Sequence, residues 1–160
     1  MNGNQKIKTF LWFDDQAEAA VNCYMAGFKD SKITHVARYG EAGPGPAGQV
    51  MVIEFTLAGQ QFVALNGGPH FKFTEAISLM VTCEDQAEVD RLWNHLVAGG
   101  APSQCGWLKD KYGLSWQIVP RRFMEMMQDK DSARTARVFA AMMQMRKFDV
   151  AALEKAYAGP

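Results

Sequence analysis

The sequence predicts an α+β fold made of two copies of one β-α-β-β-β module followed by a helical tail. The first observation is an internal repeat, in which Asp14-Asp15-Gln16-Ala17-Glu18 returns seventy residues later as Glu84-Asp85-Gln86-Ala87-Glu88. The second is that a short apolar segment precedes each copy and a helical pattern follows it. The third is a change to helical periodicity after Pro120. We expect one domain over residues 1–160, with modules at 5–73 and 74–120 and a tail at 121–160.

The first module follows from strand, cap and turn signals. The apolar segment at residues 9–13 predicts a strand, and Asp14 predicts the start of a helix that ends near Gly27. Two extended stretches, residues 32–39 and 50–57, flank a loop rich in glycine and proline. Ala58-Gly59 then predicts a tight turn into a strand at 61–66.

The second module repeats this order in a shorter form. Residues 77–83 predict a strand, and Glu84 predicts the start of a helix that ends near Gly99-Gly100. A strand at 103–108, a turn at 110–113 and a strand at 114–119 complete it.

The tail predicts three short helices, the last two starting at Asp131-Ser132 and at Asp149. It is rich in methionine, whose flexible thioether suits an adaptable surface. Two interpretations remain open: the tail covers a partner subunit, or it packs on its own domain.

Composition disfavours several classes of partner. Seventeen basic residues balance seventeen acidic ones, and no long run of like charge occurs, so we expect no nucleic-acid partner. No apolar segment reaches the roughly 18–20 residues that a membrane span needs, and the first residues do not resemble a signal peptide. Three widely spaced cysteines predict reduced thiols and a cytoplasmic location.

Four stretches carry a resemblance to a known family: Phe10-Leu11-Trp12-Phe13, Arg38-Tyr39-Gly40-Glu41, residues 64–69 (Ala-Leu-Asn-Gly-Gly-Pro) and residues 105–118 (Cys-Gly-Trp-Leu-Lys-Asp-Lys-Tyr-Gly-Leu-Ser-Trp-Gln-Ile). They resemble the PhnB-like group of the vicinal-oxygen-chelate superfamily, which includes glyoxalases, extradiol dioxygenases and bleomycin-resistance proteins. The group often carries the label 3-demethylubiquinone-9 3-methyltransferase. The resemblance implies curved mixed sheets around a ligand cavity and a homodimer.

The resemblance also implies where a metal would bind. Superfamily enzymes commonly take ligands from the first strand of each module and from a last strand, and those positions hold Lys8, Ser78 and Gln117 here. A protonated lysine has no acceptor and serine is a weak ligand. We therefore expect no cofactor and disfavour a divalent metal site.

Strand alternation predicts which residues line the cavity. We expect an apolar, aromatic surface suited to a small molecule. Its candidate ligand-binding residues are Phe10, Trp12, Asn66, Ser78, Met80, Trp107 and Gln117. Glu54 lies in an otherwise apolar strand and is a candidate general base, the alternative being that it faces solvent or pairs with a lysine. His70 is the second candidate for proton transfer.

Trp107 and the Lys109-Asp110-Lys111 turn allow two interpretations. They form an aromatic lid with two cations that select a planar acidic ligand, or they are a packed tryptophan in an ordinary hairpin.

Two functions compete, and a third is disfavoured. The first is an enzyme of lyase, isomerase or oxidoreductase type acting on a small hydrophobic or aromatic metabolite. The second is a module that sequesters a small molecule without changing it. Methyl transfer is disfavoured because no G-x-G-x-x-G turn joins a strand to a helix.

Overall fold

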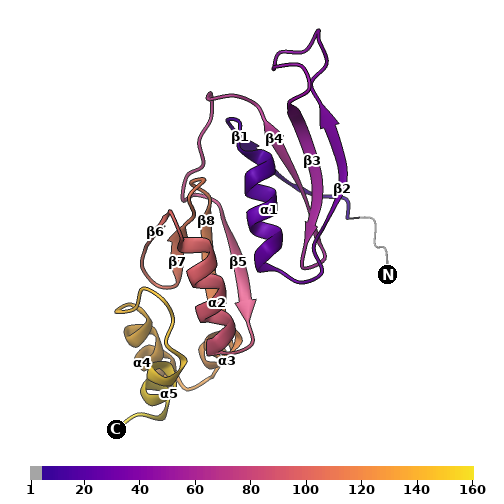
Figure 1. Ribbon diagram of the computed structural model, residues 1–160. Coiled ribbons are helices and arrows are strands. Elements are labelled where there is room, and N and C mark those ends of the chain that lie inside the picture. The colour runs from indigo at the N-terminus through magenta and orange to yellow at the C-terminus, as the bar shows by residue number, and fades with distance from the viewer. Residues whose placement is uncertain (1–4) are drawn as a thin grey trace. The chain divides into compact units, whose positions relative to one another are not determined.

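A computed structural model describes residues 5–160 of the chain (Figure 1). The chain divides into two compact units, one ending at Phe73 and the other running from Thr74 to Pro160. Each unit has its own sheet and its own core.

The first unit is a four-stranded mixed sheet with one helix. Its strands lie in the order β1-β4-β3-β2, with β1 parallel to β4 and the other pairs antiparallel. Ala58 and Gly59 both have positive φ, as the tight turn between β3 and β4 requires. The elements are β1 (Thr9–Phe13), α1 (Ala17–Gly27), β2 (Lys32–Arg38), β3 (Val50–Leu57) and β4 (Gln60–Asn66).

One face of this sheet forms the core of the unit. Alternate strand residues such as Leu11, Ile53 and Phe55 are at most 3% exposed, and α1 packs on β3 and β4 (Figure 1). Tyr24 of α1 is fully buried. Apolar side chains at every second strand position therefore meet one apolar stripe of the helix.

The start of α1 differs from the prediction. The helix begins at Ala17, and the preceding Gln16 makes no side-chain capping bond. Asn66 supplies the cap instead, because its Oδ1 accepts a hydrogen bond of 2.8 Å from the backbone N–H of Ala17. Asp14 was therefore the wrong start, since a residue distant in sequence satisfies the first helical N–H groups.

The second unit contains a sheet of the same design. Its order is β5-β8-β7-β6, with β5 parallel to β8 and the other pairs antiparallel. α2 packs on this sheet, against β5, β7 and β8. The elements are β5 (Ser78–Cys83), α2 (Gln86–Val97), β6 (Ala101–Pro102), β7 (Trp107–Lys109) and β8 (Ser115–Pro120).

The single strand predicted at 103–108 is wrong, because β6 and β7 take its place. Cys105 and Gly106 both have positive φ, which interrupts an extended chain. Their N–H groups donate to the carbonyls of Met145 and Arg146 at 2.8 and 2.6 Å. Carbonyl groups of the tail therefore accept the hydrogen bonds that a continuous strand would donate to a neighbouring strand.

The start of α2 lies one residue later than predicted. Asp85 rather than Glu84 is the N-cap, and its carboxylate accepts from the N–H of Glu88 at 2.9 Å. The Glu88 carboxylate in turn accepts from the N–H of Glu84 at 2.7 Å. This arrangement resembles a capping box, except that the Glu88 side chain reaches the N–H of the residue before the cap.

The three predicted helices of the tail are confirmed, as α3 (Arg121–Met127), α4 (Ser132–Met142) and α5 (Val150–Ala158). Asp131 and Asp149 cap the last two, as expected. Met126, Phe148 and Leu153 are almost fully buried within the unit, whereas Phe139 and Met143 are each 49% exposed. The tail thus packs on its own unit and leaves one apolar patch of α4 uncovered.

These observations confirm the α+β fold and the duplicated module. Both sheets pair their first strand in parallel with their last, and β1 and β5 end at equivalent residues of the repeat, Phe13 and Cys83. The cavity expected between the two sheets stays a prediction. No helix between residues 5 and 160 has both the length and the apolar character required to cross a bilayer.

Candidate functional site

The face of the first sheet opposite α1 is apolar and aromatic. Strand register places Phe10, Val63 and Glu54 side by side in one row. The next row holds Trp12, Leu65 and Val52. Phe10 is 58% exposed, so the helix of its own unit leaves this side uncovered. We call these six residues the first open face.

Glu54 carries the charge of the first open face, and a lysine lies beside it. The Nζ of Lys8 is 3.9 Å from Oε2 of Glu54, and both side chains are about 40% exposed. His35 is the register neighbour of Glu54 on β2. This is the arrangement of the alternative interpretation, in which the carboxylate pairs with a lysine instead of lying in a dry pocket.

The Asn66-Gly67-Gly68 segment joins the end of β4 to the start of α1. The Asn66 amide donates to the carbonyl of Val50 at 2.9 Å, in addition to capping α1. Trp12 Nε1 donates to the carbonyl of Gly68 at 2.9 Å. A Cβ on Gly67 would lie 2.4 Å from the Trp12 indole, so only glycine fits there. Asn66 is 5% exposed and acts as a structural link in this unit.

His70 lies away from the strand positions and lines a cavity of about 460 Å³. The Tyr39 hydroxyl closes one wall by donating to the carbonyl of Asn66 at 2.5 Å. The other lining residues are two carboxylates and the ends of two loops: Asp14, Asp15, residues 44–46, Gln49 and residues 66–69. Glu54 does not line this cavity, so the two proton-transfer candidates occupy different places in the unit.

The second sheet also has a face that α2 leaves uncovered. Register places Ser78, Ser115 and Lys109 in one row, and Met80, Gln117 and Trp107 in the next. Met80 is 52% exposed, whereas Trp116 and Ile118, on the opposite side of β8, are at most 2% exposed. We call these six row residues the second open face.

The metal-ligand positions implied by the resemblance do not fit a metal. The Gln117 amide donates to Ser78 Oγ at 2.8 Å, so these two groups are bonded to each other. Lys8 directs its ammonium at Glu54. An ammonium, an amide and a hydroxyl provide no anionic or imidazole ligand. Across residues 5–160, no three His, Cys, Asp or Glu side chains gather in a way that would hold a metal ion.

The turn beyond the second open face has a structural role that the sequence did not reveal. Asp110 is 5% exposed and accepts from the N–H groups of Tyr112 and Leu114 at 2.8 and 3.1 Å. Its other oxygen accepts from Trp116 Nε1 at 2.9 Å. An aspartate six residues before a buried tryptophan is a usable signal for such a bond.

The two lysines of this turn are both engaged. Lys109 forms an ion pair with Glu75, and this hydrogen bond holds the pKa of the Glu75 carboxyl below its usual value. Lys111 lies 5.2 Å from the centre of the Tyr112 ring. The two lysines of the lid interpretation thus make one ion pair and one cation–π contact within the unit, and the lid itself stays a prediction.

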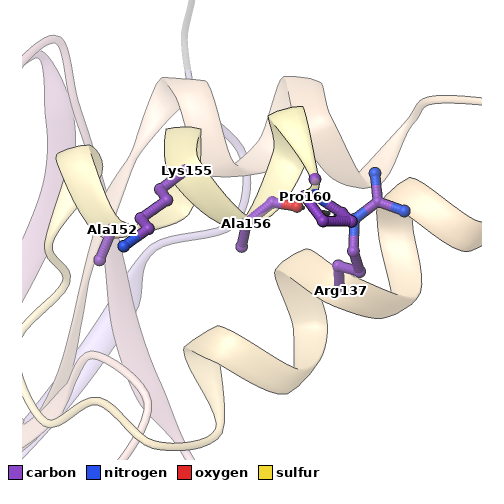
Figure 2. A pocket seen from close by; sticks show the side chains of 6 residues that line it. Arg137, Ala152, Lys155, Ala156 and Pro160 are labelled. Carbon is purple, nitrogen blue, oxygen red and sulfur yellow. Dashed lines mark hydrogen bonds between the residues drawn. The ribbon is translucent and has the colours of Figure 1, made fainter.

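The tail contains a shallow hollow of about 400 Å³ between α4 and α5 (Figure 2). Arg137 borders it and donates from Nε to the carbonyl of Ala156 at 2.9 Å, and from Nη2 to that of Tyr157 at 3.1 Å. These bonds satisfy carbonyls at the end of α5. Small side chains and the Lys155 stem form the rest of its wall.

The family match extends over both modules and ends before the helical tail. The sequence model of the family described as 3-demethylubiquinone-9 3-methyltransferase matches residues 5–119. No protein with curated function matches the chain.

Three solved structures show the fold. A protein from Bacillus cereus, described as a putative 3-demethylubiquinone-9 3-methyltransferase and PhnB protein, is 42% identical, with a TM-score of 0.68 over 72% of this chain and 99% of its own. Protein PA1353 from Pseudomonas aeruginosa is 20% identical, with a TM-score of 0.60 over 71% and 96% of the two chains. The fosfomycin resistance protein FosX from Listeria monocytogenes, solved with Mn(II) and sulfate, is 11% identical, with a TM-score of 0.50 over 75% and 90%.

The duplicated module, the family match over residues 5–119 and the 42% identity to the Bacillus protein agree with one another. The chain belongs to the 3-demethylubiquinone-9 3-methyltransferase family, to whose PhnB-like members it is similar.

Proposed function

We propose that the protein binds small hydrophobic or aromatic molecules on the open faces of its sheets, without a metal ion. One observation carries the proposal: each sheet keeps a side that the helices of its own unit leave uncovered and that carries exposed apolar or aromatic side chains. Phe10 and Met80, on the edge strands β1 and β5 of these sheets, are 58% and 52% exposed. Exposed apolar surface rimmed by a few polar groups is typical of ligand and partner sites.

Sequestration without catalysis is the form of this function that the first open face favours. A general base needs a carboxylate whose proton affinity is raised by a dry environment. Glu54 instead has Lys8 at 3.9 Å and is two-fifths exposed. His70, the other candidate, lines a cavity that Glu54 does not reach. An enzyme of lyase, isomerase or oxidoreductase type is the competing proposal, and it requires a ligand to separate Glu54 from Lys8.

Methyl transfer, which the family description names, does not fit these residues. The chain segment between β1 and α1 is Asp14-Asp15-Gln16, with no glycine to let a nucleotide-like cofactor approach the backbone. The glycines of residues 43–48 and 67–68 lie in loops that open no helix.

The test is to purify the full chain from cells under native conditions and to identify any bound small molecule by native mass spectrometry. We expect a stoichiometric, mostly apolar ligand on the wild-type protein. Phe10→Ser removes the exposed ring of the first open face and is expected to reduce ligand occupancy at least several-fold. A side chain that is 58% exposed leaves little cavity behind, so the fold is expected to survive.

The matched control is Phe139→Ser, which removes a ring of similar exposure from α4. It is expected to keep wild-type occupancy. The proposal fails if wild-type protein carries no ligand and also binds no apolar aromatic probe such as ethylbenzene. Steady conversion of the bound molecule by wild-type protein would support the enzymatic alternative over sequestration.

A further inference from the structure

The polar groups of the second open face lie together in an otherwise apolar surface. Ser78, Ser115 and Gln117 occupy neighbouring positions on β5 and β8, since Ser78 is the register partner of Ser115 and bonds to Gln117. Met80 and Trp107 flank Gln117 in its own row. Three neutral polar side chains therefore form a small cluster between a thioether and an indole.

This cluster retains unused hydrogen-bonding capacity. A serine hydroxyl has one donor and two acceptor sites, and a glutamine amide has two donors and one carbonyl. The bond of 2.8 Å from Gln117 to Ser78 uses one donor and one acceptor. Beside it, Ser115 Oγ is buried in a residue only 1% exposed and has no hydrogen-bond partner among residues 5–160. A buried hydroxyl without a partner is uncommon, and this one lies directly beside the exposed edge of the cluster that Ser78 and Gln117 form.

The cluster has no net charge available to a ligand. Lys109, which shares a row with Ser78 and Ser115, forms an ion pair with Glu75. Placing an anion or a cation against Met80 and Trp107 without a counter-charge is costly, whereas a neutral oxygen that forms hydrogen bonds there is not. The surroundings therefore select a neutral polar group on an apolar body.

We infer that Ser78 and Gln117, with Ser115 beneath them, form a neutral anchor that binds a hydroxyl or carbonyl oxygen of the ligand, at positions where superfamily enzymes commonly bind a metal. The inference rests on the proposed function, because the second open face is one of the faces to which ligand binding is assigned there. Ser78 and Gln117 bind the oxygen, and Ser115 is the register neighbour of Ser78 on β8. The substrate class is thus a neutral phenol, alcohol or ketone with an apolar or aromatic body.

Three probes of matched shape test the anchor: 4-ethylphenol, ethylbenzene and 4-ethylbenzoate. Their affinities for the full-length wild-type protein are measured by NMR titration at neutral pH. We expect 4-ethylphenol to bind roughly tenfold more tightly than ethylbenzene, as one or two good hydrogen bonds would give. The charged 4-ethylbenzoate is expected to bind more weakly than the phenol.

The double variant Ser78→Ala/Gln117→Leu is expected to reduce the preference for the phenol to about twofold or less, while its affinity for ethylbenzene stays near wild type. The matched control, Ser103→Ala/Gln104→Leu, alters the same residue types in an exposed segment and is expected to keep the preference.

The outcomes of the probe titrations distinguish failure of the proposed apolar binding site from failure of the neutral anchor. If none of the three probes binds, the proposed function fails. If the phenol and ethylbenzene bind the wild-type protein equally, or 4-ethylbenzoate binds best, the neutral anchor is overturned and the apolar site remains. Because this comparison uses wild-type protein, it holds even where the double variant folds poorly.

Discussion

The side chain of Asn66 caps the helix that begins at Ala17, through a hydrogen bond of 2.8 Å that spans 49 residues of sequence. Its amide also donates to the carbonyl of Val50. One buried side chain thus connects the end of β4, the start of β3 and the start of α1.

Replacing Asn66 is therefore expected to destabilise the first unit. Asn66→Ala removes a helix cap and leaves the Val50 carbonyl without its partner, at a combined cost of about 2–4 kcal/mol in the free energy of unfolding. Urea denaturation followed by the fluorescence of Trp12 in variants lacking the other tryptophans would report on this unit. Asn94→Ala, an exposed position on α2, is the control. A loss below about 0.5 kcal/mol would contradict the role of Asn66.

Cys83 is expected to be the least reactive of the three thiols. Burial raises the pKa of Cys83 to about 12, whereas Cys23 and Cys105 are partly exposed. Only the thiolate attacks a disulfide reagent, so near pH 8 two cysteines should react quickly and Cys83 only after unfolding. Mass spectrometry of the labelled peptides identifies the sites. Fast labelling of Cys83 in the folded protein would refute the prediction.

The same shift predicts a loss of stability at high pH. The folded state favours the neutral Cys83 thiol. The stabilisation that this gives the folded protein is fully present below the unfolded-state thiol pKa of about 8.5, and it is lost as pH rises towards about 12. Between pH 8 and 10.5, the free energy of unfolding of the wild-type protein should fall more steeply than that of Cys83→Ala. Equal slopes would show that thiol burial does not contribute.

The metal-ligand positions predict that wild-type protein binds no divalent metal tightly. Changing Ser78 to histidine and Gln117 to glutamate introduces an imidazole and a carboxylate at two groups now 2.8 Å apart. We expect micromolar or tighter Zn²⁺ or Ni²⁺ binding by the double variant and none by wild type, measured by calorimetry and elemental analysis. Ser103→His/Gln104→Glu is the control. Stoichiometric metal retained by wild-type protein would contradict this.

The homodimer stays a prediction, which sedimentation would test. Phe10, Met80, Phe139 and Met143 are each about half exposed, so apolar surface is available for association. We expect a dimer at micromolar concentration. A single monomeric species under those conditions would exclude it, and loss of the dimer in Phe139→Glu alone would place α4 at the interface.

The repeated elements were predictable because their signals are local. Short apolar segments marked β1 and β5, and in the tail Asp131 and Asp149 marked two helix starts, since a strand segment and a cap depend on neighbours within a few positions. The segment at 103–108 was not predictable in this way. Its backbone donors bond to Met145 and Arg146, and no pattern within the segment announces partners some forty residues away.

The candidate site divides along the same line. Strand alternation predicted that Phe10, Trp12, Met80 and Gln117 lie on the open sides of the two sheets, since the pleat can be inferred from the sequence. The sequence also showed that the usual metal-ligand positions hold Lys8, Ser78 and Gln117. Only the tertiary structure decided that Glu54 pairs with Lys8, that Asn66 caps a distant helix and that Ser115 is buried without a partner. These properties depend on which strands lie side by side, and hydrogen bonds and ion pairs form between groups that only folding brings within reach.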